Sequence, residues 1–299
     1  MKRFLLRSLC FLFPALLALV AVEVYVRSLP NTYKYKEAWM RKNGERVHTL
    51  LLGNSHAYFG LVPTVLGDSV FSLANVSQRL EHDRFLLKRY AGTCPHLKTV
   101  ILVADNSNLF DVPMEEDEPG RATYYQLYMG YAKHSVLSRY GFELSSMSNF
   151  WGKVLRHWKR DMADCDSMGW GCGYVASKRN PADFQPERIK EHHFHDWSST
   201  LANRRDVDSI ASWCQNRGVR LVLLMTPVSS GYTKKAEPWQ LRYVRSVADS
   251  CRQAYGAQVA DYSCDPRFSD DDFFDPDHLS DDGARKFSRI LASELFGHQ

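Results

Sequence analysis

The sequence lacks the excess of positive charge that a general nucleic-acid-binding protein carries. The formal net charge is +4, but residues 1–30 alone hold four basic residues and one acidic residue. The rest of the chain is therefore nearly neutral, which argues against a nucleic-acid partner. Internal repeats and low-complexity stretches are also missing. With 44% apolar and 13% aromatic residues, the composition is that of a folded chain with a substantial core.

Spacings typical of metal sites are scarce as well. No two of the seven cysteines have the C-x-x-C spacing of a zinc site. The cluster His192-His193-x-His195 has no nearby carboxylate pattern to complete a site. The acidic run over residues 265–282 does not have the spacing of an EF-hand loop, which favours a solvated loop. We therefore predict neither a metal ion nor another cofactor.

Cysteine usage agrees with export without establishing it. Six cysteines follow the N-terminal apolar segment, an even number that permits up to three disulfides in an oxidising compartment. Cys165 and Cys172 flank the Gly-rich segment Met168-Gly169-Trp170-Gly171 and are the local pair we consider for a bridge. Ordinary buried thiols are the alternative.

The N-terminus reads as a membrane element. A positive start, Met1-Lys2-Arg3, precedes an uncharged and mostly apolar run over residues 8–22. Residues 4–26 are long enough to cross about 30 Å of hydrocarbon at ~1.5 Å per residue. We expect a single-pass signal anchor over residues 1–30, with a cytoplasmic N-terminus and an exported (periplasmic or extracellular) domain after it. A cleaved signal peptide is the alternative, although no small-x-small cleavage site follows.

Short apolar segments alternate with helical patterns beyond the anchor. Strands are predicted at residues 48–53, 70–74, 98–104, 219–225 and 258–261, and helices at 78–90, 196–217, 236–255 and 281–296. Strands that alternate with helices need crossover connections, which give a parallel sheet with helices on both faces. The sequence therefore predicts an α/β fold over residues 31–299, a flavodoxin-like three-layer sandwich around a five-stranded parallel sheet.

Residues 111–195 interrupt this alternation. They are rich in aromatic and basic side chains and contain no strong strand pattern. An insertion between the third and fourth strands lies next to the edge where the strands end. We interpret it as a cap that shapes a carbohydrate-binding groove with aromatic faces. The alternative is a helical layer whose aromatic side chains are simply packed.

Two short segments at opposite ends of the chain carry the groups for nucleophilic catalysis. Ser55 follows the first predicted strand, and Asp275 and His278 follow the fifth. In a parallel α/β sheet, sites form outside the carboxyl ends of the strands, so both segments belong at one edge. A serine becomes a good nucleophile when a base takes its proton and a carboxylate orients that base. Asp277 is an alternative orienting carboxylate, and a helix N-cap is the alternative role for Ser55.

These motifs resemble those of the SGNH/GDSL hydrolase superfamily, in particular its membrane-anchored relatives that handle acyl groups on cell-surface polysaccharides. Gly53-Asn54-Ser55-His56 is similar to the family's Gly-Asp-Ser block, with asparagine in place of aspartate. Asp275-x-x-His278 is similar to the family's Asp-x-x-His block. The resemblance covers residues 48–104 and 219–296 and leaves out the insertion.

The resemblance implies a role for each residue of the two motifs. Ser55 would be the nucleophile, His278 the base that takes and later returns a proton, and Asp275 the group that orients the imidazole. An oxyanion hole would be built from the backbone N–H of Ser55, a backbone N–H after the second strand and an asparagine side chain after the third.

The oxyanion blocks depart from the family pattern. The second block, normally Asn-x-Gly, reads Asn75-Val76-Ser77 here, so Ser77 would supply the backbone N–H. A serine can replace glycine only where the local dihedral angles suit a residue with a Cβ. In the third block Asn106 is the nearest candidate, with Asn108 behind it. His56 and Asn75 are expected to line the groove, with packing as the alternative for His56.

We therefore expect a membrane-anchored, exported serine esterase or O-acyltransferase, such as a carbohydrate O-acetyl esterase or O-acetyltransferase. Its substrate would be an acylated cell-surface polysaccharide, and a multi-span membrane acyltransferase is a candidate partner. The triad serves both reactions, and exclusion of water decides between hydrolysis and transfer. The alternative is a catalytically impaired module of the same fold that binds glycan or a membrane acyl-transfer partner.

Overall fold

The computed structural model describes residues 1–131, 141–145, 147–158, 164–185 and 195–297. The chain divides into two compact units. The N-terminal unit comprises Met1–Tyr35 and Pro119–Ala163, and the sheet unit comprises Lys36–Glu118 and Asp164–Gln299. This division differs from the predicted boundary at residue 30, and it splits the predicted cap, residues 111–195, between the two units.

The N-terminal unit is helical in its described parts. It holds α1 (Lys2–Ser28), the start of α2 (Thr32–Asn43), α8 (Pro119–Met129), the 3₁₀ turn η3 (Glu143–Ser145) and α9 (Met147–Trp158). Tyr33 packs its ring against those of Tyr124 and Tyr125, with centroids 5.2 and 4.9 Å apart. Such contacts explain why residues 119–163 group with the N-terminal segment. Within α1, Cys10–Ser28 is long and apolar enough to cross a membrane.

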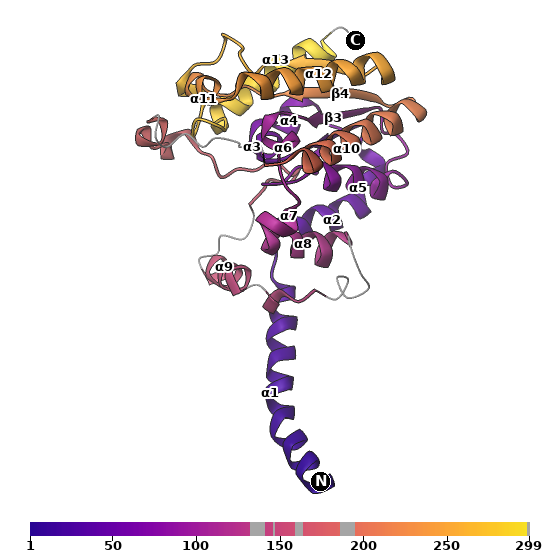
Figure 1. The fold of residues 1–299 in the computed structure, drawn as a ribbon, viewed down its shortest axis with the longest axis vertical. Coiled ribbons are helices and arrows are strands. Elements are labelled where there is room, and N and C mark those ends of the chain that lie inside the picture. Colours follow the sequence, from indigo (N-terminus) through magenta and orange to yellow (C-terminus); the bar gives the residue numbers. More distant parts are fainter. Residues whose placement is uncertain (132–140, 146, 159–163, 186–194, 298–299) are drawn as a thin grey trace. The chain divides into compact units, whose positions relative to one another are not determined.

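The sheet unit is built on five parallel strands, which confirms the predicted α/β class (Figure 1). The strands are β1 (Thr49–Leu52), β2 (Val70–Ser72), β3 (Thr99–Val103), β4 (Arg220–Met225) and β5 (Gln258–Asp261), in the order β2-β1-β3-β4-β5. This is the order of flavodoxin-like doubly wound sheets. Every residue of β1 and β3 is buried, because strands covered on both faces carry apolar residues on both.

Helices cover both faces of the sheet. On one face, α3 (Ser55–Gly60), α4 (Pro63–Leu66) and α13 (Asp281–Phe296) share a core with alternate strand residues such as Leu51, Ile101 and Val222. The intervening residues, such as Leu50, Leu102 and Leu223, are also buried and point to the opposite layer. There α10 (Trp197–Asn216) packs against both α5 (Leu80–Tyr90) and α12 (Pro238–Tyr255). The four predicted helices, α5, α10, α12 and α13, begin and end within about two residues of their predicted bounds.

The register brings the carboxyl ends of the strands to one edge. Leu52 pairs with Leu102, Val103 with Leu224, and Met225 with Asp261. Short helices and turns follow at or near this edge: α6 (Asn106–Leu109), α7 (Met114–Asp117), α11 (Ser230–Lys235) and the 3₁₀ turn η7 (Asp270–Asp272). The remaining turns are η1 (Gly44–Arg46), η4 (Ala176–Lys178) and η5 (Pro181–Phe184). Residues that directly follow different strands are therefore neighbours in space, and this edge carries the candidate site.

Candidate active site

Ser55, His278 and Asp275 converge at this edge, as predicted from their positions after β1 and β5. The Nε2 atom of His278 lies 2.8 Å from the Oγ atom of Ser55. Its Nδ1 atom lies 2.9 and 3.1 Å from the two carboxylate oxygens of Asp275. A proton on Nδ1 is donated to Asp275, which leaves Nε2 as an acceptor for the serine hydroxyl.

The turn after β1 fixes the position of Ser55. Gly53 has φ 131°, and a Cβ there would lie 2.9 Å from the Cβ of Val103, so the close approach of β3 requires glycine. Asn54 is the N-cap of α3, and its side chain accepts the N–H of His56. The capping role thus falls to Asn54, and the alternative of Ser55 as N-cap is wrong. Ser55 is the first helical residue, so its N–H has no partner carbonyl four residues earlier in the helix.

Backbone contacts hold Asp275 in place. One of its carboxylate oxygens accepts the N–H groups of Asp277 and His278, both at 2.9 Å. The N–H of Phe274 donates to the carbonyl of His278 at 2.9 Å, which closes the loop. Ser280 then acts as the N-cap of α13. Because the carboxylate is bound by its own loop, Asp275 and the imidazole that it orients keep a fixed relative geometry.

Aromatic rings surround His278. The ring of Phe59 stacks on Tyr174 at 3.8 Å, and Tyr174 stacks on Phe274 at 4.3 Å. Tyr174 also meets the edge of His278, with centroids 5.2 Å apart. Trp170 is buried and its indole N–H donates to the carbonyl of Phe59. Part of the predicted cap therefore borders the site through Tyr174, whereas Trp170 is packed, as in the alternative interpretation.

His56 forms a network that the sequence did not predict. Its Nδ1 atom lies 2.6 Å from Asp105, and its Nε2 atom lies 2.9 Å from Asp277. The residue is only 4% exposed, which favours the packed alternative over the expected position lining the groove. Asp277 binds His56 and lies 4.0 Å from Nε2 of His278, on the side away from Nδ1. Asp275, not Asp277, therefore orients the imidazole of His278.

The two carboxylates keep His56 protonated. Burial alone would lower the pKa of His56, but Asp277 and Asp105 outweigh it and raise that pKa well above 6.5. Burial likewise works to raise the pKa of Asp105, and the His56 imidazolium overcomes this and holds the pKa below 3.8. A buried cation between two anions thus joins the loops after β1, β3 and β5.

Ser77 adopts a backbone conformation that glycine favours. Its φ is 57°, and it is the only non-glycine residue with positive φ in the part of the chain that the structure describes. Its hydroxyl donates to the carboxylate of Glu118. Asn75 in the same block is buried, and its side-chain nitrogen has no hydrogen-bond partner among the described residues. Asn75 is thus buried in the structure, and its expected position lining the groove stays a prediction.

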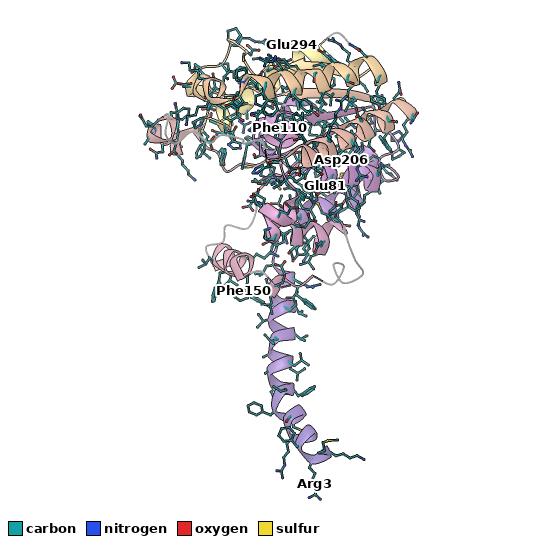
Figure 2. The ribbon with its side chains drawn as sticks, in the orientation of Figure 1. Arg3, Glu81, Phe110, Phe150, Asp206 and Glu294 are labelled. Atoms are coloured by element: carbon teal, nitrogen blue, oxygen red, sulfur yellow. The ribbon has the colours of Figure 1, made fainter. Side chains whose placement is uncertain are left out.

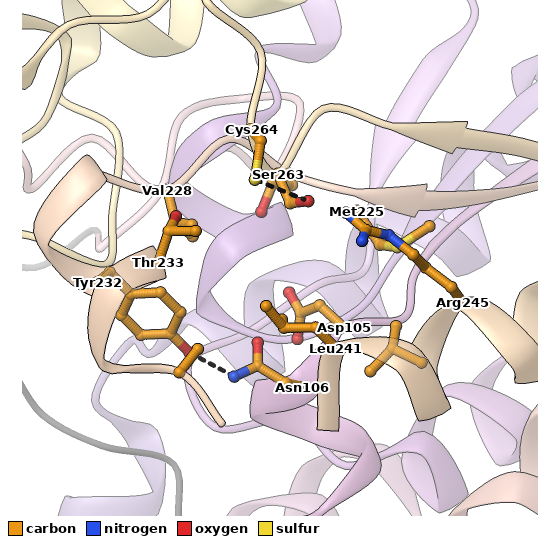
Figure 3. A pocket seen from close by; sticks show the side chains of 13 residues that line it. Asp105, Asn106, Met225, Val228, Tyr232, Thr233, Leu241, Arg245, Ser263 and Cys264 are labelled. Carbon is orange, nitrogen blue, oxygen red and sulfur yellow. Dashed lines mark hydrogen bonds between the residues drawn. The ribbon is translucent and has the colours of Figure 1, made fainter. Parts of the chain in front are cut away.

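The two asparagines after β3 have different surroundings. Asn108 accepts the N–H of Asp105 at 3.0 Å and donates to the carbonyl of Val103 at 2.8 Å, so its amide is part of the turn itself. Asn106 donates one amide N–H to the hydroxyl of Tyr232 at 3.0 Å (Figure 3). Both amides have a second N–H, but in the described structure the amide of Asn106 is not bound to its own turn. Of the two, Asn106 is therefore the candidate oxyanion donor.

We expect Ser77→Val to lower the free energy of unfolding by about 1–3 kcal/mol relative to Ser77→Gly, because a β-branched residue is strained in the left-handed region. Urea unfolding followed by tryptophan fluorescence measures the difference. Ser77→Gly is the matched control, since both variants lose the hydroxyl bond to Glu118. Equal stability of the two variants would contradict the left-handed conformation.

The sequence also offered a cysteine pair for a disulfide and a histidine cluster for a metal ion. Every cysteine is a free thiol, with Cys165 buried and Cys172 exposed, so the structure does not contain a bridge between them. His192 and His193 lie outside the described residues.

His56, Asp277 and His278 each offer a ligand atom, and these atoms lie within 4.8 Å of one another. A protonated His56 has no lone pair for a metal ion, so the raised pKa favours the hydrogen-bonded network over a metal site.

Comparison with protein-family models finds no match to this chain, and no curated protein matches it. The residues of the site and their geometry are therefore what indicates a function for this chain.

Proposed function

We propose that the chain is a serine esterase or O-acyltransferase of the SGNH type. The observation that carries the proposal is the hydrogen-bonded series Ser55–His278–Asp275. As the Ser55 oxygen attacks an acyl carbonyl, its proton passes to Nε2 of His278, and Asp275 stabilises the resulting imidazolium. His278 then returns the proton to the leaving alcohol, and the acyl group remains on Ser55 as an ester. Water or a sugar hydroxyl takes it in the second half of the reaction.

Backbone geometry supports an oxyanion hole of the same type. The N–H of Ser55 lies at the start of α3, and the conformation of Ser77 is one that a glycine would adopt. With the side chain of Asn106 these groups make three candidate donors. Removing one such donor typically costs about 10²–10³ in turnover, so an intact set matters for rate.

The proposed function includes a membrane anchor formed by α1. We propose that α1 crosses the membrane with its N-terminus in the cytoplasm and that the sheet unit lies on the other side. Glu23 of α1 accepts the N–H groups of Glu143 and Leu144, which favours a retained helix over a cleaved signal peptide. In this position the site would meet acylated cell-surface polysaccharide, and a multi-span membrane acyltransferase would be a suitable source of acyl groups.

One observation favours a second candidate, a catalytically impaired module that binds glycan or a membrane acyl-transfer partner. One of the two amide N–H groups of Asn106 is already engaged by Tyr232. If Tyr232 holds the amide away from the developing oxyanion, the site loses one donor and becomes slow.

Covalent labelling separates the two candidates. We expect a fluorophosphonate probe to label the folded wild type, and Ser55→Ala to abolish the labelling because the probe bonds to an activated serine oxygen. Ser263→Ala is the matched control at the same edge, and it should retain full labelling. Gel fluorescence and intact mass measure both. Absence of labelling on a wild type with a cooperative unfolding transition would favour the binding module.

A further inference from the structure

Polar contacts near the C-terminal end of α1 fix a segment of the insertion to this helix. The carboxylate of Glu23 accepts the N–H groups of Glu143 and Leu144 at 3.0 and 3.1 Å. Arg27 donates to Glu23 at 2.5 Å and to the carbonyl of Gly141 at 2.6 Å. Glu23 is only 8% exposed. Residues 141–144 therefore lie at the level of Glu23 along the helix.

The length of the apolar stretch of α1 indicates how deep Glu23 would lie in a bilayer. Cys10–Ser28 comprises 19 residues, about 28 Å at 1.5 Å per residue. This is close to the thickness of the hydrocarbon core. Glu23 lies five residues before the end, which is about 7 Å inside it, and interfacial helices bury their apolar faces by about 5–10 Å. If α1 spans a bilayer, residues 141–144 lie at the headgroup boundary.

A buried lysine holds α9 on the same segment. Lys153 is 3% exposed, and its ammonium group binds the carboxylate of Glu143 and lies 2.8 Å from the hydroxyl of Tyr128. It also lies 4.8 and 4.6 Å from the ring centroids of Tyr124 and Tyr128. Lys153 thus points into the N-terminal unit, whereas Trp151 and Leu155 of the same helix are exposed.

Large apolar side chains are exposed on this part of the N-terminal unit. Phe142, Trp151 and Leu155 are 57, 54 and 56% exposed. Trp151 and Leu155 are four residues apart, so they share one face of α9, the helix on which Figure 2 labels Phe150. Apolar side chains of α1, such as Phe11, Leu12 and Phe13, are exposed too. Exposed aromatic residues at the end of a membrane span are typical of the bilayer interface.

A cleft of about 460 Å³ adds a second observation. Its apolar walls are Leu16, Leu19, Val20 and Val24 of α1 and Phe142 and Leu144 of the facing segment. Glu23 and Arg27 complete the lining. The cleft therefore runs from apolar side chains within the span to an arginine at its polar end, which matches an acyl chain below a phosphate.

We propose that Phe142, Trp151 and Leu155 insert into the headgroup boundary of the bilayer, and that a phospholipid occupies the cleft with its phosphate near Arg27. The proposal rests on the membrane anchor in the proposed function, but not on the chemistry of Ser55. It makes the N-terminal unit a lipid-binding element as well as an anchor. A face of this kind would fix the tilt and rotation of α1 in the membrane.

Depth-dependent fluorescence quenching tests the proposal. The full chain is reconstituted into phosphatidylcholine–phosphatidylglycerol vesicles that carry bromine near the headgroup or near the end of the acyl chain. We expect the shallow bromolipid to quench more than the deep one, and Trp151→Phe to lose a large part of the shallow quenching. Trp197→Phe is the matched control, because Trp197 is 49% exposed in the sheet unit and should lose none.

Two results would overturn the proposal. One is quenching of Trp151 by aqueous iodide with no effect of bromolipid, which would place the face in water. The other is protection of Trp151 from both quenchers, which would mean that a protein covers the face. Alkaline carbonate extraction of the same membranes tests the anchor separately. Release of the wild type would refute the anchor itself, whereas retention without lipid quenching would refute only the interfacial face.

Discussion

Replacing His278 by alanine is expected to lower ester turnover by about 10⁴-fold or more and to abolish fluorophosphonate labelling, while the chain remains folded. His278 is the only group that the described structure places within hydrogen-bonding distance of the Ser55 hydroxyl. Without it, no described side chain is within hydrogen-bonding distance to take the serine proton. The side chain of His278 is partly exposed and lies in a loop closed by backbone bonds, so its loss should leave the unfolding transition cooperative. Hydrolysis of p-nitrophenyl acetate measures turnover.

Asp275→Asn makes the same test more specific. The amide oxygen can still accept the backbone N–H groups of Asp277 and His278, so the loop should keep its shape. The amide nitrogen, however, would donate to Nδ1 and force the imidazole into the wrong tautomer, which costs about 10⁴ in turnover in a comparable triad. Asp271→Asn is a control, since that side chain is 93% exposed and should not affect the rate. Unchanged labelling in both His278→Ala and Asp275→Asn would mean that Ser55 has another base, or that the probe reacts elsewhere.

The sheet could be predicted from the sequence because its signals are local. Each strand is a short, mostly apolar run between turn residues, and β1 and β3 are buried throughout because both of their faces are covered. The convergence of Ser55 and His278 followed from topology, since both follow strands of one parallel sheet. Neither inference needed the contacts of any side chain.

The division into units could not be predicted in this way. It depends on contacts between residues far apart in the sequence, such as Tyr33 with Tyr125 and Glu23 with Glu143. No periodic pattern records such contacts. The sequence could not distinguish the roles of Asn106 and Asn108 either. Only the hydrogen bonds of the structure show that the amide of Asn108 stabilises the turn in which it lies.

The network around His56 could be predicted from the sequence only in part. Asp105 directly follows β3 and Asp277 follows β5, so the rule that placed Ser55 beside His278 would also have placed these carboxylates at the same edge. The sequence gives no spacing signature for the network, however, because each loop contributes a single residue. A histidine next to a nucleophile is as compatible with an exposed position as with a buried one.

His56→Leu is expected to lower the free energy of unfolding by about 3–5 kcal/mol, because removal of one partner leaves buried charge without compensation. The side chains of Asp105 and Asp277 are only 10 and 17% exposed and would then repel one another. Urea unfolding at pH 6 measures the loss. The double variant His56→Leu/Asp277→Asn should recover part of it, since one of the two unpaired carboxylates is gone.

The stability lost in His56→Leu should depend on pH, and the pKa shifts of His56 and Asp105 give the direction. The pKa of His56 in the folded protein lies well above 6.5, so its contribution to stability is complete below about pH 6.5 and declines as the pH rises through the folded-state pKa. The pKa of Asp105 is lowered, so its contribution is present above about pH 3.8 and is lost as the pH falls through its folded-state pKa. The difference between wild type and His56→Leu should therefore be largest between these limits and smaller in alkaline solution. A difference that stays constant from pH 5 to the alkaline range would show that His56 is neutral, and that the two carboxylates are not balanced by an imidazolium.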